Sequence, residues 1–109
     1  MNKEMQDVIN AISIEFNKEI DKTIDILLRK AKIKRRGSQK DIQVNLIENG
    51  YDLVQYAFKK NPLKRLIALT NIGNKFIEGY LVEYDVKDGK LIKKLIKHKS
   101  QFEKIIKEI

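Results

Sequence analysis

The sequence predicts a single α+β domain in which helices predominate. Its 109 residues fit one domain with one core, and 42% of them are hydrophobic while 35% are charged, as in globular proteins. Over most of the chain apolar residues recur at intervals of three and four, the period of an amphipathic helix. Residues 53–69 combine β-forming residues with a turn signal. These observations favour several helices and one hairpin.

The chain is strongly basic, with 23 Lys and Arg against 15 Asp and Glu and a formal net charge of +8. It contains no cysteine, which excludes disulfides, thiolate zinc sites and cysteine nucleophiles. No apolar run approaches the roughly 18 residues that would cross a bilayer. We therefore expect a cytoplasmic protein that does not enter the membrane.

The positive charge is concentrated in the middle of the chain. Residues 1–28 carry three Lys and six acids, a net charge of −3. Residues 29–65 carry eleven basic residues and three acids, a net charge of +8, and residues 66–109 carry nine and six, a net charge of +3. Because closely spaced like charges repel, a polyanionic partner is expected, with nucleic acid first and an anionic membrane surface second.

The first element is helical. From residue 5 to residue 31 apolar side chains follow one helical stripe, which includes Val8, Ile9, Ile12 and Phe16. One long helix and two shorter ones both fit this stripe. In the second case Asp21 would cap a helix over about residues 22–30.

The next helix is expected over residues 38–48. Ser38 and Asp41 have the spacing of a capping box, and Gly50 supplies a residue that tolerates the left-handed conformation at a helix end. Asn49-Gly50 is also a strong hairpin signal, so residues 42–57 could instead form a hairpin. We favour the helix because both of its ends are marked.

A basic hairpin follows. Residues 53–58 and 66–69 are rich in β-forming and apolar side chains, and the turn between them is Lys59-Lys60-Asn61-Pro62. Four basic residues therefore lie at or beside the tip: Lys59, Lys60, Lys64 and Arg65.

Two more helices complete the expected fold. Thr70 could cap a helix lined by Phe76, Tyr80 and Tyr84, and apolar residues at spacings of three and four continue from residue 91 to residue 109. A competing interpretation pairs residues 76–86 with 90–97 as a hairpin around Asp88-Gly89. A short last helix would then be capped by Ser100 and Glu103.

The order of helix, helix, basic loop, helix, basic hairpin and helix is that of a winged helix-turn-helix domain. Residues 22–50, KTIDILLRKAKIKRRGSQKDIQVNLIENG, resemble the helix-turn-helix part of small archaeal winged-helix DNA-binding proteins. Residues 66–81, LIALTNIGNKFIEGYL, are similar to the segment that follows the wing in that family. The resemblance covers about residues 5–85. It implies a winged helix-turn-helix domain over residues 1–85 and a C-terminal helical extension over 86–109 that forms a homodimer.

This resemblance implies a transcriptional regulator that binds double-stranded DNA. The helix from Ser38 would enter the major groove, where Gln39, Lys40 and Gln43 would meet base edges. Backbone amides at its start would hold a phosphate oxygen. The expected phosphate contacts are the basic residues of the preceding turn and of the wing: Lys32, Lys34, Arg35, Arg36, Lys59, Lys60, Lys64 and Arg65.

Other residues favour structural roles. Tyr51, Tyr56 and Phe58 are expected in the core rather than stacked on bases, and His98 is expected in solvent. An enzyme is not expected, and neither is a cofactor, a metal ion or a small-molecule substrate. The least weak catalytic alternative is a metal-dependent nuclease with Glu83, Asp85, Asp88 and Lys90. The main alternative function is a small helical protein whose basic face binds an acidic protein.

Overall fold

A computed structural model of the chain describes residues 3–109, so residues 1 and 2 of the expected first domain lie outside it. Three helices and four strands follow one another as α1 (Lys3–Lys30), α2 (Gln39–Glu48), β1 (Tyr51–Phe58), β2 (Asn61–Asn71), β3 (Phe76–Asp85), β4 (Lys90–Ile96) and α3 (Lys99–Ile106).

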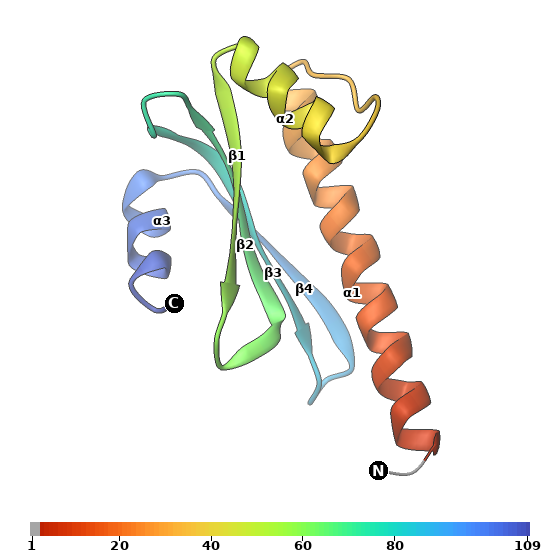
Figure 1. Cartoon of the computed structure of the whole chain (residues 1–109). Helices are drawn as coiled ribbons and strands as arrows, with labels where there is room; N and C mark the ends of the chain where they lie inside the picture. The colour runs from red at the N-terminus through yellow and green to blue at the C-terminus, as the bar shows by residue number, and fades with distance from the viewer. Residues whose placement is uncertain (1–2) are drawn as a thin grey trace.

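The strands form one antiparallel sheet in the order β1-β2-β3-β4, each joined to the next by a hairpin. The register pairs Leu53 with Leu69, and Tyr80 with Leu95. Figure 1 shows α1 and α2 over one face of the sheet and α3 over the other. Since the sheet is open, β1 and β4 are its edge strands.

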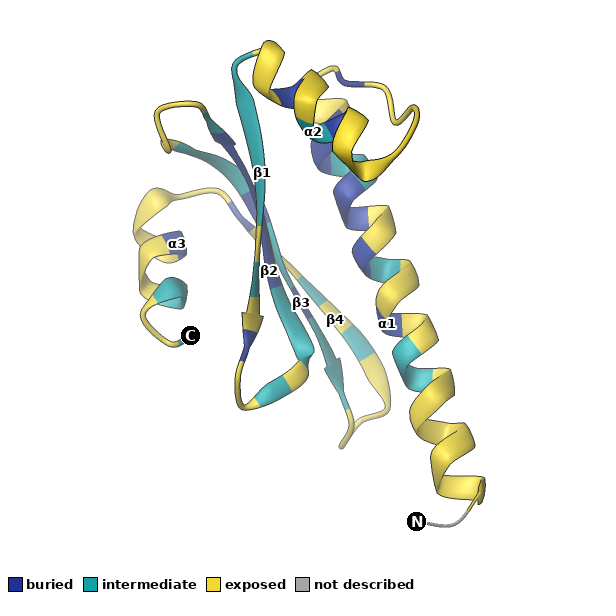
Figure 2. Ribbon diagram, viewed as in Figure 1, coloured by how far each residue is buried: buried dark blue, intermediate teal, exposed yellow. Residues whose placement is uncertain are grey.

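Each face of the sheet has its own hydrophobic cluster. On the α1 side Phe16, Leu27 and Leu46 pack with Ile67 and Val82. The smaller cluster on the α3 side is built on Leu66, Ala68, Ile96, Phe58 and Phe102. Because both faces are covered, all the residues from Leu66 to Thr70 in the central strand β2 are buried (Figure 2).

The start and the end of α2 confirm the prediction for residues 38–48. The Ser38 hydroxyl accepts a hydrogen bond from the Asp41 backbone N–H at 3.2 Å, and Asp41 accepts one from the Ser38 backbone N–H at 2.9 Å. After the helix, Gly50 has φ +87°, the left-handed conformation expected there. The alternative hairpin over 42–57 is wrong. Residues 3–30 form one continuous helix, so Asp21 caps nothing.

The basic hairpin is also confirmed as β1 and β2 with their turn. By contrast, the helix expected from Thr70 to Tyr84 is wrong, because β2 runs on to Asn71 and residues 76–85 form β3. Apolar residues at 76, 77, 80, 81 and 84 mimic a helical stripe. They lie on both faces of a strand that is covered on both faces.

The continuous helix expected over residues 91–109 is wrong as well. Residues 90–96 form β4, which pairs with β3 around Asp88-Gly89 as the competing interpretation proposed. A short helix follows, but its N-cap is His98 rather than Ser100. Its apolar residues Phe102, Ile105 and Ile106 pack against the sheet, so the expected extension over 86–109 is part of the sheet and its covering.

These differences exclude the winged helix-turn-helix fold. In that fold the basic hairpin would end the sheet and a helix would follow it. Here β2 continues into pairing with β3, and the basic hairpin is half of a four-stranded meander. The fold is α+β, with a long N-terminal helix, a second helix, the sheet and a short C-terminal helix.

Candidate functional site

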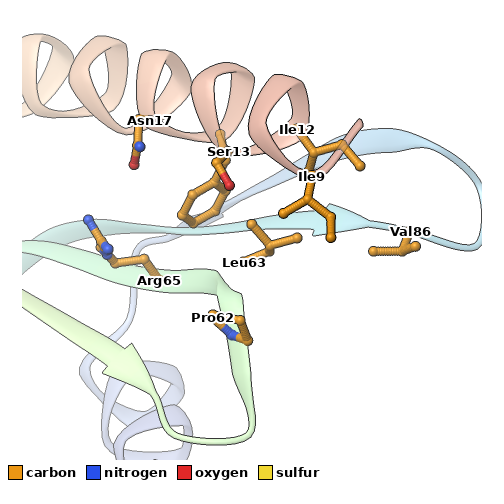
Figure 3. A pocket seen from close by; sticks show the side chains of 9 residues that line it. Ile9, Ile12, Ser13, Asn17, Pro62, Leu63, Arg65 and Val86 are labelled. Atoms are coloured by element: carbon orange, nitrogen blue, oxygen red, sulfur yellow. The ribbon is translucent and has the colours of Figure 1, made fainter. Parts of the chain in front are cut away.

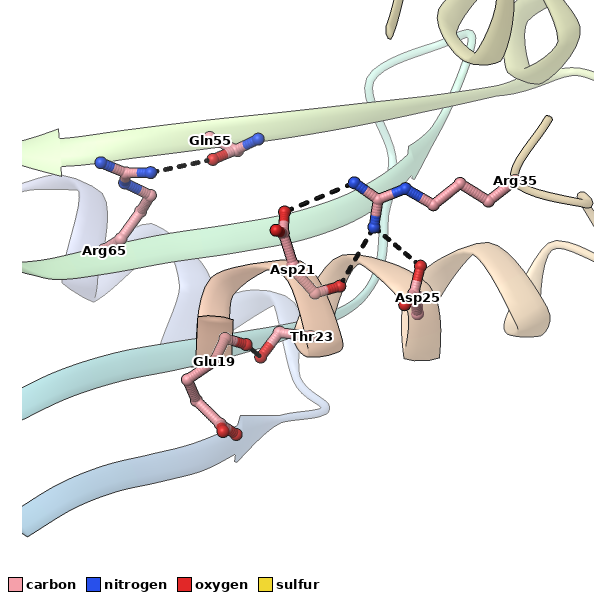
Figure 4. A network of polar contacts seen from close by, with 7 residues as sticks. All are labelled: Glu19, Asp21, Thr23, Asp25, Arg35, Gln55 and Arg65. Carbon is pink, nitrogen blue, oxygen red and sulfur yellow. Dashed lines mark hydrogen bonds and ion pairs between the residues drawn. The ribbon is translucent and has the colours of Figure 1, made fainter. Parts of the chain in front are cut away.

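The basic turn between α1 and α2 is held in place by an acidic face of α1. Arg35 reaches Asp25 at 2.8 Å and Asp21 at 3.4 Å (Figure 4). The pKa of the Arg35 guanidinium is raised, mainly by its hydrogen bond with Asp25. Arg35 is therefore a structural anchor for the turn. Its predicted companions Lys32, Lys34 and Arg36 are exposed, and within residues 3–109 no carboxylate oxygen lies within 4.0 Å of them.

Helix α2 leaves Gln39 and Lys40 of the predicted recognition surface exposed, whereas Gln43 is half-buried. The Gln43 amide donates a hydrogen bond to Asp52 of β1, and Gln39 and Gln43 line a hollow of about 140 Å³ between α2, Arg35 and β1. Outward-facing side chains on the helix include the apolar Val44 and Ile47 as well as Lys40. Gln43 is therefore engaged within the chain, and base-edge contacts by Gln39 and Lys40 stay a prediction.

One of the amides at the start of α2 already has a partner within the chain. The Ser38 backbone N–H, a predicted phosphate donor, already donates to Asp41. Hydrogen bonds from the Ser38 backbone and hydroxyl hold the pKa of the Asp41 carboxyl below its ordinary value. The Asp41 carboxylate thus already accepts from one of the amides that were expected to hold a phosphate.

The second basic group divides between the two faces of the sheet. Arg65 lies on the α1 side, 5.8 Å from the Phe16 ring centroid and within 3.5 Å of the Gln55 side-chain oxygen (Figure 4). Lys64 points to the other side, where its Nζ lies 4.7 Å from the Phe58 ring centroid. Lys59 and Lys60 occupy the turn itself.

The three lysines of the second basic group lie near two further lysines, Lys94 and Lys104, that were not predicted from the sequence. Lys59, Lys60 and Lys64 line a hollow of about 330 Å³ beside the end of α3, and Lys94 and Lys104 line a neighbouring hollow of about 300 Å³. Glu108 borders both hollows, so they form one surface. We call it the α3-side lysine surface: Lys59, Lys60, Lys64, Lys94 and Lys104. In residues 3–109 no carboxylate oxygen approaches these ammonium groups within 4.0 Å.

The structure does not bring the two predicted basic groups together. The α1–α2 turn lies at one end of β1 and the β1–β2 turn at the other (Figure 1). Eight residues of β1 separate them, about 26 Å at about 3.3 Å per residue. The first group is beside α1, whereas Lys59, Lys60 and Lys64 are on the α3 side.

The aromatic residues belong to the packing, as predicted for Tyr51, Tyr56 and Phe58. Phe102 stacks on Phe76 with ring centroids 4.7 Å apart and meets Tyr56 edge-on at 6.1 Å. All aromatic side chains in residues 3–109 are buried or half-buried.

The acidic residues of the nuclease alternative do not form a metal site. Glu83 accepts a hydrogen bond from the Asn61 amide, and Asp85 accepts backbone hydrogen bonds from Lys87 and Asp88 within the turn. No group of three His, Asp or Glu side chains within residues 3–109 has a metal-binding arrangement.

His98 is exposed, as expected. Within residues 3–109 no helix is long and apolar enough to cross a membrane.

A different kind of site lies between the first half of α1 and the sheet. Ile9, Ile12 and Phe16 of α1 face Pro62 and Leu63 of β2 across an open groove of about 340 Å³ (Figure 3). Val86, just after β3, closes one end, and Ser13, Asn17 and Arg65 supply polar edges. We call it the α1–β2 groove.

Comparisons of the chain with known protein families, known proteins and solved structures find no significant match.

Proposed function

We propose that the protein is a non-enzymatic, cytoplasmic DNA-binding protein that holds the phosphate backbone of duplex DNA on the α3-side lysine surface. The observation that carries this proposal is the gathering of five lysines from three different parts of the chain around two adjoining hollows. Since no carboxylate of residues 3–109 pairs with these lysines, their charge is available to an anionic partner.

Binding of this kind is driven by counterion release. Each phosphate neutralised by a lysine frees condensed counterions, so log K falls with log salt by about 0.9 for each contact. Five contacts would give a slope of about −4.5. The α1–α2 turn would contribute only through the long-range field, since its group lies at the other end of β1.

The aromatic residues favour a duplex over a single strand. Proteins that bind single strands usually offer exposed aromatic rings on which bases stack. Here Phe58, Phe76 and Phe102 are used in packing between the sheet and α3. Lysines act as point charges for phosphate, so recognition at this surface would depend little on base sequence.

Charge reversal in two matched sets of three residues tests the proposal. The test variant is Lys60→Glu, Lys94→Glu and Lys104→Glu, and the control is Lys32→Glu, Lys34→Glu and Arg36→Glu; all six residues are exposed. Both variants change the net charge by −6. We expect the test variant to lose at least about tenfold more affinity for a 20-bp duplex than the control, by fluorescence anisotropy. Circular dichroism would establish that both fold.

Two results would overturn the proposal. Equal losses in the two variants would mean that only net charge matters. No duplex affinity in the unsubstituted protein at low salt would exclude DNA and leave an acidic protein as the alternative partner of these lysines.

A further inference from the structure

A second group of basic side chains without acidic partners lies where α1 ends. Residues 29–36 contain six basic residues and no acid. Lys30 is paired with Glu78, and Arg35 is paired with acids of α1. Within residues 3–109 no carboxylate oxygen lies within 4.0 Å of the other four charged groups. We call them the α1–α2 turn surface: Arg29, Lys32, Lys34 and Arg36.

The chain holds this surface in a defined place on α1. The Ile33 backbone N–H donates to the Leu28 carbonyl oxygen at 2.9 Å, and the Ile33 side chain is buried. Two residues further on, Arg35 is anchored by its ion pairs with α1. Arg29 and Lys34 line a hollow of about 380 Å³ beside these anchors. Because the backbone of the turn is already ordered, less conformational freedom is lost when an anion binds to it.

The α1–α2 turn surface and the α3-side lysine surface do not lie along one straight duplex. They are at opposite ends of β1, about 26 Å apart along the strand, and on opposite sides of the sheet (Figure 1). A duplex that reached both would have to turn back around a molecule whose Cα atoms extend over 48 Å at most. The persistence length of DNA is about 500 Å, so such a sharp turn is strongly disfavoured.

We propose that the two surfaces bind two different duplexes, so that one chain bridges two DNA segments. This inference rests on the function proposed for the α3-side lysine surface and adds a second site to it. The first duplex is affected by the α1–α2 turn surface only through its long-range field. Four phosphate contacts at the turn would give a slope of log K against log salt of about −3.6, against about −4.5 for the five lysines, so we expect the turn to be the weaker site.

Capture of a second duplex tests bridging directly. A 20-bp duplex is fixed to beads, and a fluorescent duplex of the same sequence is added at 50 mM salt with or without the full chain. Fluorescent duplex reaches the beads only if protein holds both duplexes at once. We expect the unsubstituted protein to capture it, and we expect capture to fall steeply with added salt.

Two matched triple variants locate the second site. The first reverses three charges of the α1–α2 turn surface: Lys32→Glu, Lys34→Glu and Arg36→Glu. The second reverses three exposed lysines outside both surfaces: Lys18→Glu, Lys75→Glu and Lys87→Glu. Both variants change the net charge by −6. We expect the turn variant to capture at least about tenfold less duplex than the second variant. Circular dichroism would check that both fold.

Anisotropy with a single duplex separates failure of bridging from failure of DNA binding. No duplex affinity in the unsubstituted protein would overturn both proposals. Binding of one duplex without capture of another would overturn bridging alone and leave the α3-side lysine surface as the DNA site. Equal capture by the two triple variants would also contradict bridging through the turn, as it would if two copies of the chain joined their α3-side lysine surfaces to two duplexes.

Discussion

Two buried threonines differ in whether the side-chain hydroxyl has a hydrogen-bond partner. Thr23 Oγ1 donates to the Glu19 carbonyl oxygen at 2.8 Å within α1 (Figure 4). Thr70 Oγ1, in β2, is buried and has no partner among residues 3–109. An unpaired buried hydroxyl costs free energy that a paired one does not. Because the two threonines are similarly buried, we expect removal of their hydroxyls to change the free energy of unfolding in opposite directions.

Replacement by valine keeps the shape and removes the hydroxyl. We expect Thr70→Val to raise the free energy of unfolding by about 1 kcal/mol, and Thr23→Val to lower it by about 1 kcal/mol through the lost hydrogen bond. Urea unfolding followed by circular dichroism measures both. Destabilisation of Thr70→Val to the same degree as Thr23→Val would show that the Thr70 hydroxyl is satisfied.

Single residues that act on their own backbone were readable from the sequence. The Ser38 cap, the Asp41 partner and Gly50 after α2 act within a few residues of one another, so their pattern determines the local structure. The role of Gln43 could not be read in this way. Its partner Asp52 belongs to the next strand, and contact with it depends on how α2 packs on the sheet.

Among the elements, β3 shows why the winged helix-turn-helix topology was wrong. Its apolar side chains occupy both faces because helices cover the sheet on both sides, and this removes the alternation that normally marks a strand. The same residues then fit a helical period. Gly79 near the middle of β3 was a contrary signal beside the Asp88-Gly89 turn, since glycine weakens a helix interior by about 1 kcal/mol.

Gly79 is needed for close contact between β3 and β2. A Cβ at this position would lie 2.8 Å from the Ile67 carbonyl oxygen and 3.3 Å from the Ala68 Cα, both backbone atoms. We expect Gly79→Ala to cost about 1–3 kcal/mol, the range for overpacking. Gly73→Ala is the control, because the nearest atom to its Cβ is the Asn71 side-chain oxygen at 3.4 Å.

Thermal unfolding of the two alanine variants measures this difference. The Gly73 variant should stay within about 0.5 kcal/mol of the unsubstituted protein. A Gly79 variant that is equally stable would mean that β3 and β2 are further apart than the sheet described here.

Finding the complete α3-side lysine surface also required the correct assignment of residues 90–96 as a strand. Once residues 90–96 are a strand, alternation places Lys94 on the α3 side with Ile96, next to Lys104 of α3. In a continuous helix over residues 91–109 this relation is lost. Lys59, Lys60 and Lys64 were found from the sequence because they are close together in the chain.

On the scale of the whole molecule, charge is distributed by topology rather than by position in the sequence. The basic middle of the chain is divided between two ends of β1, and one of its residues, Arg35, is paired with the acidic face of α1. Lysines from the turn, β2, β4 and α3 gather on the other side of the sheet. On the α1 side of the sheet, apolar residues of α1 leave an open surface.

The salt dependence of duplex DNA binding tests the central claim most directly. Anisotropy titrations of the unsubstituted protein between 50 and 200 mM salt give the slope of log K against log salt. Binding on the α3-side lysine surface predicts a slope of about −4 to −5. A slope shallower than about −2, or no binding at 50 mM salt, would contradict phosphate binding by these lysines.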